Sequence, residues 1–225
     1  MHEKSRERVA KVCRELADTG LCGEGSGAVS FFDRRFGVIL VNSAGAISSE
    51  TSVDSILAVV DGDILEGEGE IPPELDGHIE VYNEFSLISS IITADPPCAV
   101  AFAQAGRPIK PYGTAHAESF GDLIPCTRRL TPGEISGELY KNLGKLNVET
   151  LADPKLAKAG RAVMTCSDKV HALGVDPVDS LCRMKAVERM AKSAFMTEVL
   201  MRGGASGGTR MQEDLLRRVY ENNNF

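Results

Sequence analysis

The sequence lacks an apolar run long enough to span a membrane, and its first residues, MHEKSRERVAK, are charged, unlike a signal peptide. It also lacks an excess of positive charge. A net charge of −7 gives no electrostatic support for binding nucleic acid or an anionic membrane surface. We therefore expect a cytoplasmic protein that binds neither nucleic acid nor membranes.

The six cysteines lack the CxxC spacing that is typical of zinc sites and redox motifs. We interpret them mainly as reduced and mostly buried thiols. The chain also lacks an internal repeat. With 225 residues, 43% of them hydrophobic, it is long enough for one domain with a real core.

The central stretch 87–128 combines a strand, a helix and polar residues. A buried strand is predicted over 87–93, and a helix over 98–104 that starts after Pro96 and Pro97 and ends at Gly106. Active sites of α/β proteins are commonly built where such elements converge. A predicted loop follows, dense in polar side chains: Tyr112, Thr114, His116, Glu118 and Asp122.

The remaining pattern predicts alternating helices and strands. Asp61 and Gly62 form a hairpin signal, and Thr131 and Glu134 form a capping box. We expect one domain over 1–202, and a flexible glycine-rich break (203–208) with a short helix over 203–225. The predicted helices are 5–19, 49–55, one starting near Glu74, 179–201 and 212–220, and the other strands are 36–42, 56–60, 64–65, 146–151 and 162–166. One apolar stripe of helix 179–201 is expected in the core: Leu181, Met184, Val187, Ala191, Ala194 and Phe195.

Several sequence words resemble a known family. They are AQAGRPI, GTAHAESF, IPCTR and LTPGEISGELYKNLGKLNVET, with GEGSGAVS, VNSAG, VDGDILEG and PPELDGHIEVY agreeing in outline. The chain resembles the class II aldolase/adducin family, most closely its L-ribulose-5-phosphate 4-epimerase branch. The resemblance implies a single α/β domain with a three-layer fold, a central mostly antiparallel sheet flanked by helices, and a homotetramer with sites at subunit boundaries.

The resemblance also implies substrate-binding residues. Ser26, Gly27 and Gly45 match family positions that contact the substrate phosphate, and Thr114 and His116 match the GTAHAESF word. Other phosphate contacts of the family are replaced, since Ala28 stands for an Asn, Ala44 for a Ser, and Pro72 and Pro73 for a Ser pair. Proline offers neither a hydroxyl nor an N–H group, so we expect a substrate without a phosphate.

Two carboxylates match the family's acid/base positions. Glu74 corresponds to the general acid/base of the aldolases, and Glu118 to an epimerase Asp. Each also has a plain structural interpretation, since Glu74 suits the first turn of a helix and Glu118 suits an exposed loop. We interpret His78 as a structural histidine.

The resemblance implies a metal site whose histidines are missing. The family's His-x-His pair falls on Thr93 and Asp95, and its third histidine on Asp168, so a three-His zinc site is not present. One hypothesis is an oxygen-rich site of Asp95, Asp168 and Glu74 for a divalent metal such as Mg²⁺ or Mn²⁺, Zn²⁺ being a further candidate ion. The other, which we favour, is carboxylates without a metal, with Asp95 as the N-cap before Pro96.

Two functions remain open. The first is a divergent aldolase- or epimerase-like enzyme that acts on a small hydroxy-carbonyl compound by enolate chemistry. The second is a non-catalytic binding or assembly protein that resembles the adducin head, because metal and phosphate contacts change together. New chemistry at Cys98 or Cys166, near the former metal position, is a further hypothesis.

Overall fold

A seven-stranded antiparallel sheet forms the centre of the protein. The computed structural model describes residues 2–23, 25–153, 161–202 and 211–223. The strands follow the order β4-β3-β2-β1-β5-β7-β6, and every neighbouring pair is antiparallel. They are β1 (Ala28–Asp33), β2 (Val38–Asn42), β3 (Ile56–Val60), β4 (Asp63–Glu66), β5 (Ser90–Ala94), β6 (Ala162–Met164) and β7 (Val170–Gly174). The predicted antiparallel α/β fold is confirmed.

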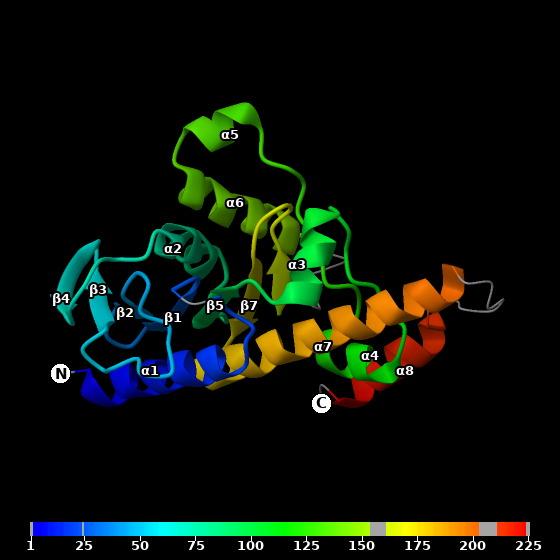
Figure 1. The fold of residues 1–225 in the computed structure, drawn as a ribbon, viewed down its shortest axis with the longest axis horizontal. Coiled ribbons are helices and arrows are strands. Elements are labelled where there is room, and N and C mark those ends of the chain that lie inside the picture. The colour runs from blue at the N-terminus through cyan, green and yellow to red at the C-terminus, as the bar shows by residue number, and fades with distance from the viewer. Residues whose placement is uncertain (1, 24, 154–160, 203–210, 224–225) are drawn as a thin grey trace.

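Helices cover both faces of the sheet (Figure 1). α1 and α7 run along one face, and α2 and α6 cover the other. No helix of the described part is long and apolar enough to cross a membrane. The helices are α1 (Glu3–Asp18), α2 (Glu74–Glu84), α3 (Pro97–Gln104), α4 (Thr114–Phe120), α5 (Pro132–Ser136), α6 (Leu139–Leu151), α7 (Pro177–Arg202) and α8 (Glu213–Asn223).

The alternation of side chains along the strands separates two cores. On β5, Ile92 and Ala94 pack in the large core with α1, α3 and α7. Ile91 packs on the opposite face, in a second core with Val81 of α2 and Leu173 of β7. Thr93 has the same parity as Ile91, so it faces the α2 and α6 side. This arrangement brings a row of polar side chains under α2.

Two turns form where the sequence predicts regular structure. β5 begins only at Ser90, and Leu87 lies 85% exposed in the turn after α2. The predicted helix over 49–55 is absent. The hydroxyl of Thr51 accepts the amide of Ser48 and donates to the carbonyl of Ala46, so side-chain bonds hold this segment in turns.

Two segments are helical where the sequence suggests otherwise. The predicted strand over 146–151 forms the end of α6, in which Gly144, Asn147 and Leu151 are buried at helical spacing. The predicted polar loop contains α4, whose buried residues are His116, Ala117 and Phe120.

The start of α3 is capped by a distant residue. Asp95 makes no cap, and Pro96 holds the N-cap position without a side-chain hydrogen bond. Instead the Glu188 carboxylate of α7 accepts hydrogen bonds from the amides of Cys98 and Ala99, at 3.0 Å each. A tertiary contact therefore replaces the predicted local cap.

The C-terminal helices follow the prediction with one correction. The expected core positions of α7 are buried, but Phe195 is 57% exposed. α8 packs against α4, where the Tyr220 ring lies against Gly121. The predicted glycine-rich break at 203–208 lies outside the described residues.

The hairpin turn and the capping box are confirmed, with positive φ at Asp61 and Gly62.

α2 and α6 cross at two glycines. A Cβ at Gly144 would lie 2.5 Å from the Gly77 Cα, so no side chain fits between the backbones. We expect Gly144→Ala to lower the free energy of unfolding by about 2 kcal/mol, because overpacking forces the helices apart. Urea denaturation measures the change. Gly133→Ala on α5 is the control, since a Cβ there meets no atom within 4 Å, and equal stability of the two variants would contradict the close crossing.

Candidate functional site

An ion pair between Lys169 and Glu74 forms the centre of the site. Glu74 is the first residue of α2, and Lys169 directly precedes β7 in the turn from β6. The Lys169 Nζ lies 2.8 Å from the Glu74 Oε1, and the two side chains are only 26% and 14% exposed. The pair is therefore partly shielded from water, which strengthens its attraction relative to a surface pair.

Further acidic groups surround the Lys169 ammonium. Burial lowers the pKa of Lys169, but the hydrogen bond and charge of Glu74 and the charges of Asp168 and Asp95 outweigh this, so the pKa is raised. Burial raises the pKa of Asp168, and the Glu74 charge adds to it. Burial, followed by the Asp95 charge, raises the pKa of Cys22 to about 12, so its thiol stays protonated. Lys169 is thus a permanent cation at neutral pH.

The ion pair lies between two cavities, because both residues line each of them. The smaller cavity, of about 310 Å³, is lined by Ser26, Gly27 and Gly45. The structure therefore brings these three predicted substrate-binding residues together with Glu74. Their role in binding a substrate stays a prediction. The lining also includes the replaced positions Ala44, Pro72 and Pro73.

The larger cavity, of about 580 Å³, lies between the sheet and the α2–α6 layer. Its floor includes Ile91 of β5, Val163 of β6 and Leu173 of β7, and its cover includes Leu139 and Leu143 of α6. Polar groups converge at Glu74 and Lys169. A largely apolar cavity with a few convergent polar groups is the usual form of a small-molecule site.

A continuous chain of buried side-chain hydrogen bonds runs beneath the larger cavity. Its members come from β1, α2, β5, β7 and α6 and the turn after β6. Thr93 and His171 are direct partners in the sheet register, which places their side chains next to each other. The successive bonds are Tyr82–Ser30 (2.6 Å), Ser30–His78 Nδ1 (2.7 Å), His78 Nε2–Thr93 (2.7 Å), Thr93–His171 Nδ1 (2.8 Å), His171 Nε2–Thr165 (2.9 Å) and Thr165–Asn147 Oδ1 (3.0 Å).

The direction of every bond follows from the Asn147 end. Because the Thr165 hydroxyl donates to the Asn147 carbonyl oxygen, it accepts from the Nε2–H of His171. His171 Nδ1 then accepts from the Thr93 hydroxyl, which in turn accepts from the Nε2–H of His78. His78 Nδ1 accepts from the Ser30 hydroxyl, and that hydroxyl accepts from Tyr82. Each imidazole is therefore neutral with one N–H. Burial lowers the pKa of both histidines to about 3, in agreement with this pattern.

The side chains present do not fit the metal site that the family resemblance implies. All four ring nitrogens of His78 and His171 are bonded to hydroxyl groups, so neither ring has a free lone pair for a metal. The Asp95 carboxylate accepts the amide of Gly23 at 2.8 Å, and Glu74 binds Lys169. Among the described residues, no three His, Cys, Asp or Glu side chains are placed to hold a metal ion.

The other predicted residues lie apart from this site. Thr114, His116 and Glu118 are on α4, and none of them lines either cavity at the ion pair. Thr114 and Glu118 are exposed. His116 is buried, and its Nε2 bonds the Asp122 carbonyl at 2.8 Å. Their predicted roles stay predictions.

Sequence reasoning missed Lys169, His171 and Arg129, all of which line the larger cavity. Lys169 had a detectable signal, since a lysine directly precedes a buried strand and follows an aligned site position, Asp168. His171 occupies the inward parity of β7, opposite Thr93. The sequence does not show that β5 and β7 are paired. The contacts of Lys169 with Glu74 and of His171 with Thr93 therefore could not be derived without the sheet order. Of the cysteines considered, Cys166 lines the cavity and Cys98 lies at the start of α3.

Comparisons with known proteins agree with the fold. The family described as "Class II Aldolase and Adducin N-terminal domain" matches residues 7–194. An L-fuculose 1-phosphate aldolase structure superposes with a TM-score of 0.80 at 20% identity, over 99% of this chain and 97% of that chain. YgbL from Escherichia coli gives 0.75 at 15% identity, over 97% and 99%. L-fuculose-1-phosphate aldolase from Thermus thermophilus gives 0.69 at 18%, over 91% and 98%.

The neutral histidines predict a loss of stability in mild acid. Their folded-state pKa of about 3 lies below the ordinary value of 6.5. Below pH 6.5 the unfolded chain therefore binds two protons that the folded chain excludes, and the free energy of unfolding falls. Between pH 7 and pH 5 we expect the two histidines to lower it by roughly 4 kcal/mol, which urea denaturation at both pH values measures. The raised pKa of Asp168 acts in the opposite direction.

Replacing one histidine separates its contribution. His171→Gln retains polar atoms but does not titrate in this range, so we expect the loss between pH 7 and pH 5 to shrink by about 2 kcal/mol. An unchanged pH dependence in this variant would show that His171 is not buried in its neutral form.

Proposed function

Because the chain belongs to the class II aldolase and adducin family, we propose that it is an enzyme that acts on a small hydroxy-carbonyl compound through an enolate. The observation that carries this proposal is the Lys169–Glu74 pair, held 2.8 Å apart between two cavities. Enolate chemistry needs a base for the proton on carbon and a positive group for the developing oxyanion. The pair offers one of each.

Lys169 supplies the positive group. Its raised pKa keeps the side chain an ammonium, which has no lone pair and therefore cannot form a Schiff base with a carbonyl. The ammonium instead donates hydrogen bonds to the carbonyl oxygen of the substrate, and it stabilises the negative charge that develops there. The surrounding protein limits water at Lys169, so this stabilisation exceeds that of an exposed lysine.

Glu74 serves as the base. One of its carboxylate oxygens binds Lys169, and the carboxylate removes the proton from the carbon next to the carbonyl. Returning this proton to the other face of the carbon gives epimerisation. In an aldol cleavage the carboxylate instead removes the proton of the hydroxyl group one carbon further on. The bond between that carbon and the carbon next to the carbonyl then breaks, its electrons form the enolate, and the proton is returned to the enolate carbon. Since the side chains at the site do not fit a metal, we propose that both steps proceed without one.

The smaller cavity favours a substrate head that carries no phosphate. Among the described residues that line it, Lys169 is the one cation, and Glu74 already neutralises it. Pro72 and Pro73 add no donors. Hydroxyl groups of a sugar-like compound can bond Ser26 and the backbone of Gly27 and Gly45 there.

A second copy of the chain could complete the site. Glu118 lies on α4, away from Glu74, so both carboxylates can act on one substrate only if a neighbouring copy supplies one of them. We propose a homo-oligomer, expected as a tetramer, in the cytoplasm.

A non-catalytic binding role is the alternative. It is favoured by the joint replacement of family positions, with Thr93 bonded into the buried chain in place of the first metal histidine. In that case the pair would hold a ligand without turning it over, or the fold would serve assembly as the adducin head does.

Exchange of the proton next to a carbonyl tests the enolate directly. Wild-type protein incubated in D₂O with dihydroxyacetone and a panel of unphosphorylated ketoses should wash deuterium into that position, as proton NMR detects. We expect Glu74→Gln and Lys169→Met each to lower the rate at least ~100-fold, because one removes the base and the other the oxyanion partner.

Asp76→Asn and Lys145→Met are matched controls, since both residues are exposed and lie on α2 and α6 outside the cavity linings. Their exchange rates should equal that of the wild type. A wild-type protein that exchanges no compound of the panel, with or without added divalent ions, would instead favour the binding role.

A further inference from the structure

The larger cavity exceeds the needs of a small hydroxy-carbonyl head. An apolar protein cavity of about 150 Å³ accommodates one benzene molecule. At about 580 Å³ the cavity beneath α6 has room for roughly four times as many heavy atoms. The polar head already has the smaller cavity beyond the ion pair. The large cavity therefore fits a second, apolar part of the ligand.

The lining is apolar on opposite walls. Val163 and Leu173 of the sheet are almost fully buried, and Leu139 and Leu143 of α6 face them across the cavity. In the chain of buried hydrogen bonds beneath the cavity, each hydroxyl and imidazole already has its partners within that chain. These walls favour hydrocarbon over a sugar, whose hydroxyl groups would lose bonds to water.

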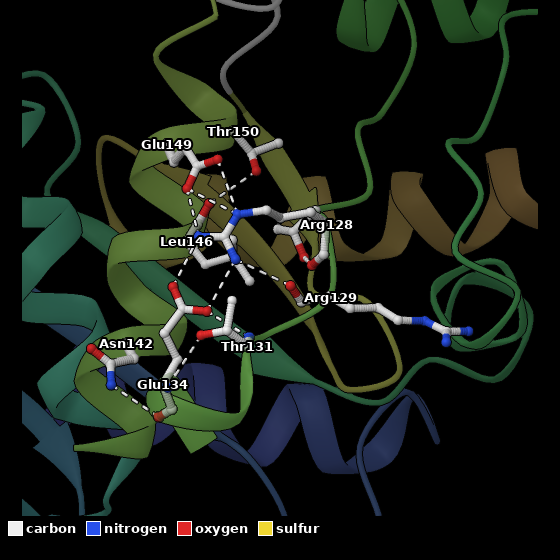
Figure 2. Close-up of polar contacts among 9 residues, drawn as sticks. Arg128, Arg129, Thr131, Glu134, Asn142, Leu146, Glu149 and Thr150 are labelled. Atoms are coloured by element: carbon white, nitrogen blue, oxygen red, sulfur yellow. Dashed lines mark hydrogen bonds and ion pairs between the residues drawn. The ribbon is translucent and has the colours of Figure 1, made fainter. Parts of the chain in front are cut away.

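A cationic residue lines the same cavity. Arg129 lines it, and its guanidinium forms no ion pair with any residue the structure describes. The neighbouring acids are engaged elsewhere, because Arg128 binds both Glu134 and Glu149 at 2.9 Å (Figure 2). In Figure 2 the Arg129 side chain points away from this cluster. An anion at the cavity rim would thus meet an arginine that no nearby carboxylate occupies.

From these observations we propose that the larger cavity binds a medium-length hydrocarbon chain bearing a carboxylate, with the chain between α6 and the sheet and the carboxylate at Arg129. The proposal rests on the proposed function in one respect: this chain is the apolar part of the substrate whose carbonyl reaches Lys169. Binding of the chain alone requires neither Lys169 nor turnover.

Isothermal titration with straight-chain carboxylates from hexanoate to dodecanoate, below their micelle concentrations, tests the proposal. The dissociation constant should fall about fourfold with each added methylene until the chain fills the cavity. Arg129→Gln should weaken all lengths by a similar factor of roughly three to ten, because it removes one partly solvated charge contact. Arg189→Gln on α7 is the control, since that exposed arginine lies outside the cavity.

Filling the cavity provides the second test. Leu143→Trp should weaken the longest bound chain at least tenfold and hexanoate least, whereas Val175→Trp, at an exposed residue outside the cavity, should change nothing. Leu139→Phe serves the same purpose if circular dichroism shows that the tryptophan variant does not fold. The proposal is overturned if the affinity does not depend on chain length, if it is unchanged in the Leu143→Trp variant, or if no carboxylate of the series binds.

The two proposals fail separately. Length-dependent binding without deuterium exchange would retain the cavity ligand and reject the enolate chemistry. Deuterium exchange of small ketoses without length-dependent binding of carboxylates would retain the enolate chemistry and reject the cavity ligand.

Discussion

The buried chain from Tyr82 to Asn147 is the interaction on which the rest of the site depends. It joins β1, α2, β5, β7 and α6 through neutral groups, and each group between the Tyr82 donor and the Asn147 acceptor both donates and accepts. Buried polar groups are costly unless every one is paired, so the chain fixes the position of each element that contributes to it. Its one-way order also fixes His78 and His171 as uncharged.

Two features of the site follow from that constraint. Both imidazoles are uncharged because their ring nitrogens are hydrogen-bonded to hydroxyl groups, so the positive charge at the site comes from Lys169. The β6–β7 turn places Lys169 next to Glu74 at the start of α2. Since Asn147 ties α6 to the turn after β6 and Gly144 lets α6 approach α2, the space beside these contacts is a defined cavity. The same packing therefore places the charged pair and shapes the pocket next to it.

Much of this architecture could be predicted from the sequence, and the failures have physical reasons. Continuous apolar runs with β-branched residues predict β2 and β3, and the Asp61-Gly62 turn predicts the hairpin. The end of α6 was mistaken for a strand because its buried Gly144 and Asn147 are not apolar, although they lie at helical spacing. The sequence predicts Asp95 as the cap on α3, whereas Glu188 supplies it from 90 residues away. Glu74 can be identified from the sequence because it matches a family motif. Its contact with Lys169 cannot be predicted in this way, because it depends on β5 and β7 being neighbours in the sheet.

The central proposal is that the Lys169 ammonium takes the place of the metal ion that the family resemblance implies. The most direct measurement is the metal content per chain, by elemental analysis of protein purified without chelator or affinity metal and then dialysed with excess Zn²⁺, Mn²⁺ or Mg²⁺. We expect a content well below one ion per chain for each metal, both before and after loading. Near-stoichiometric metal that is lost when Glu74 or Asp168 is replaced by its amide would contradict the claim.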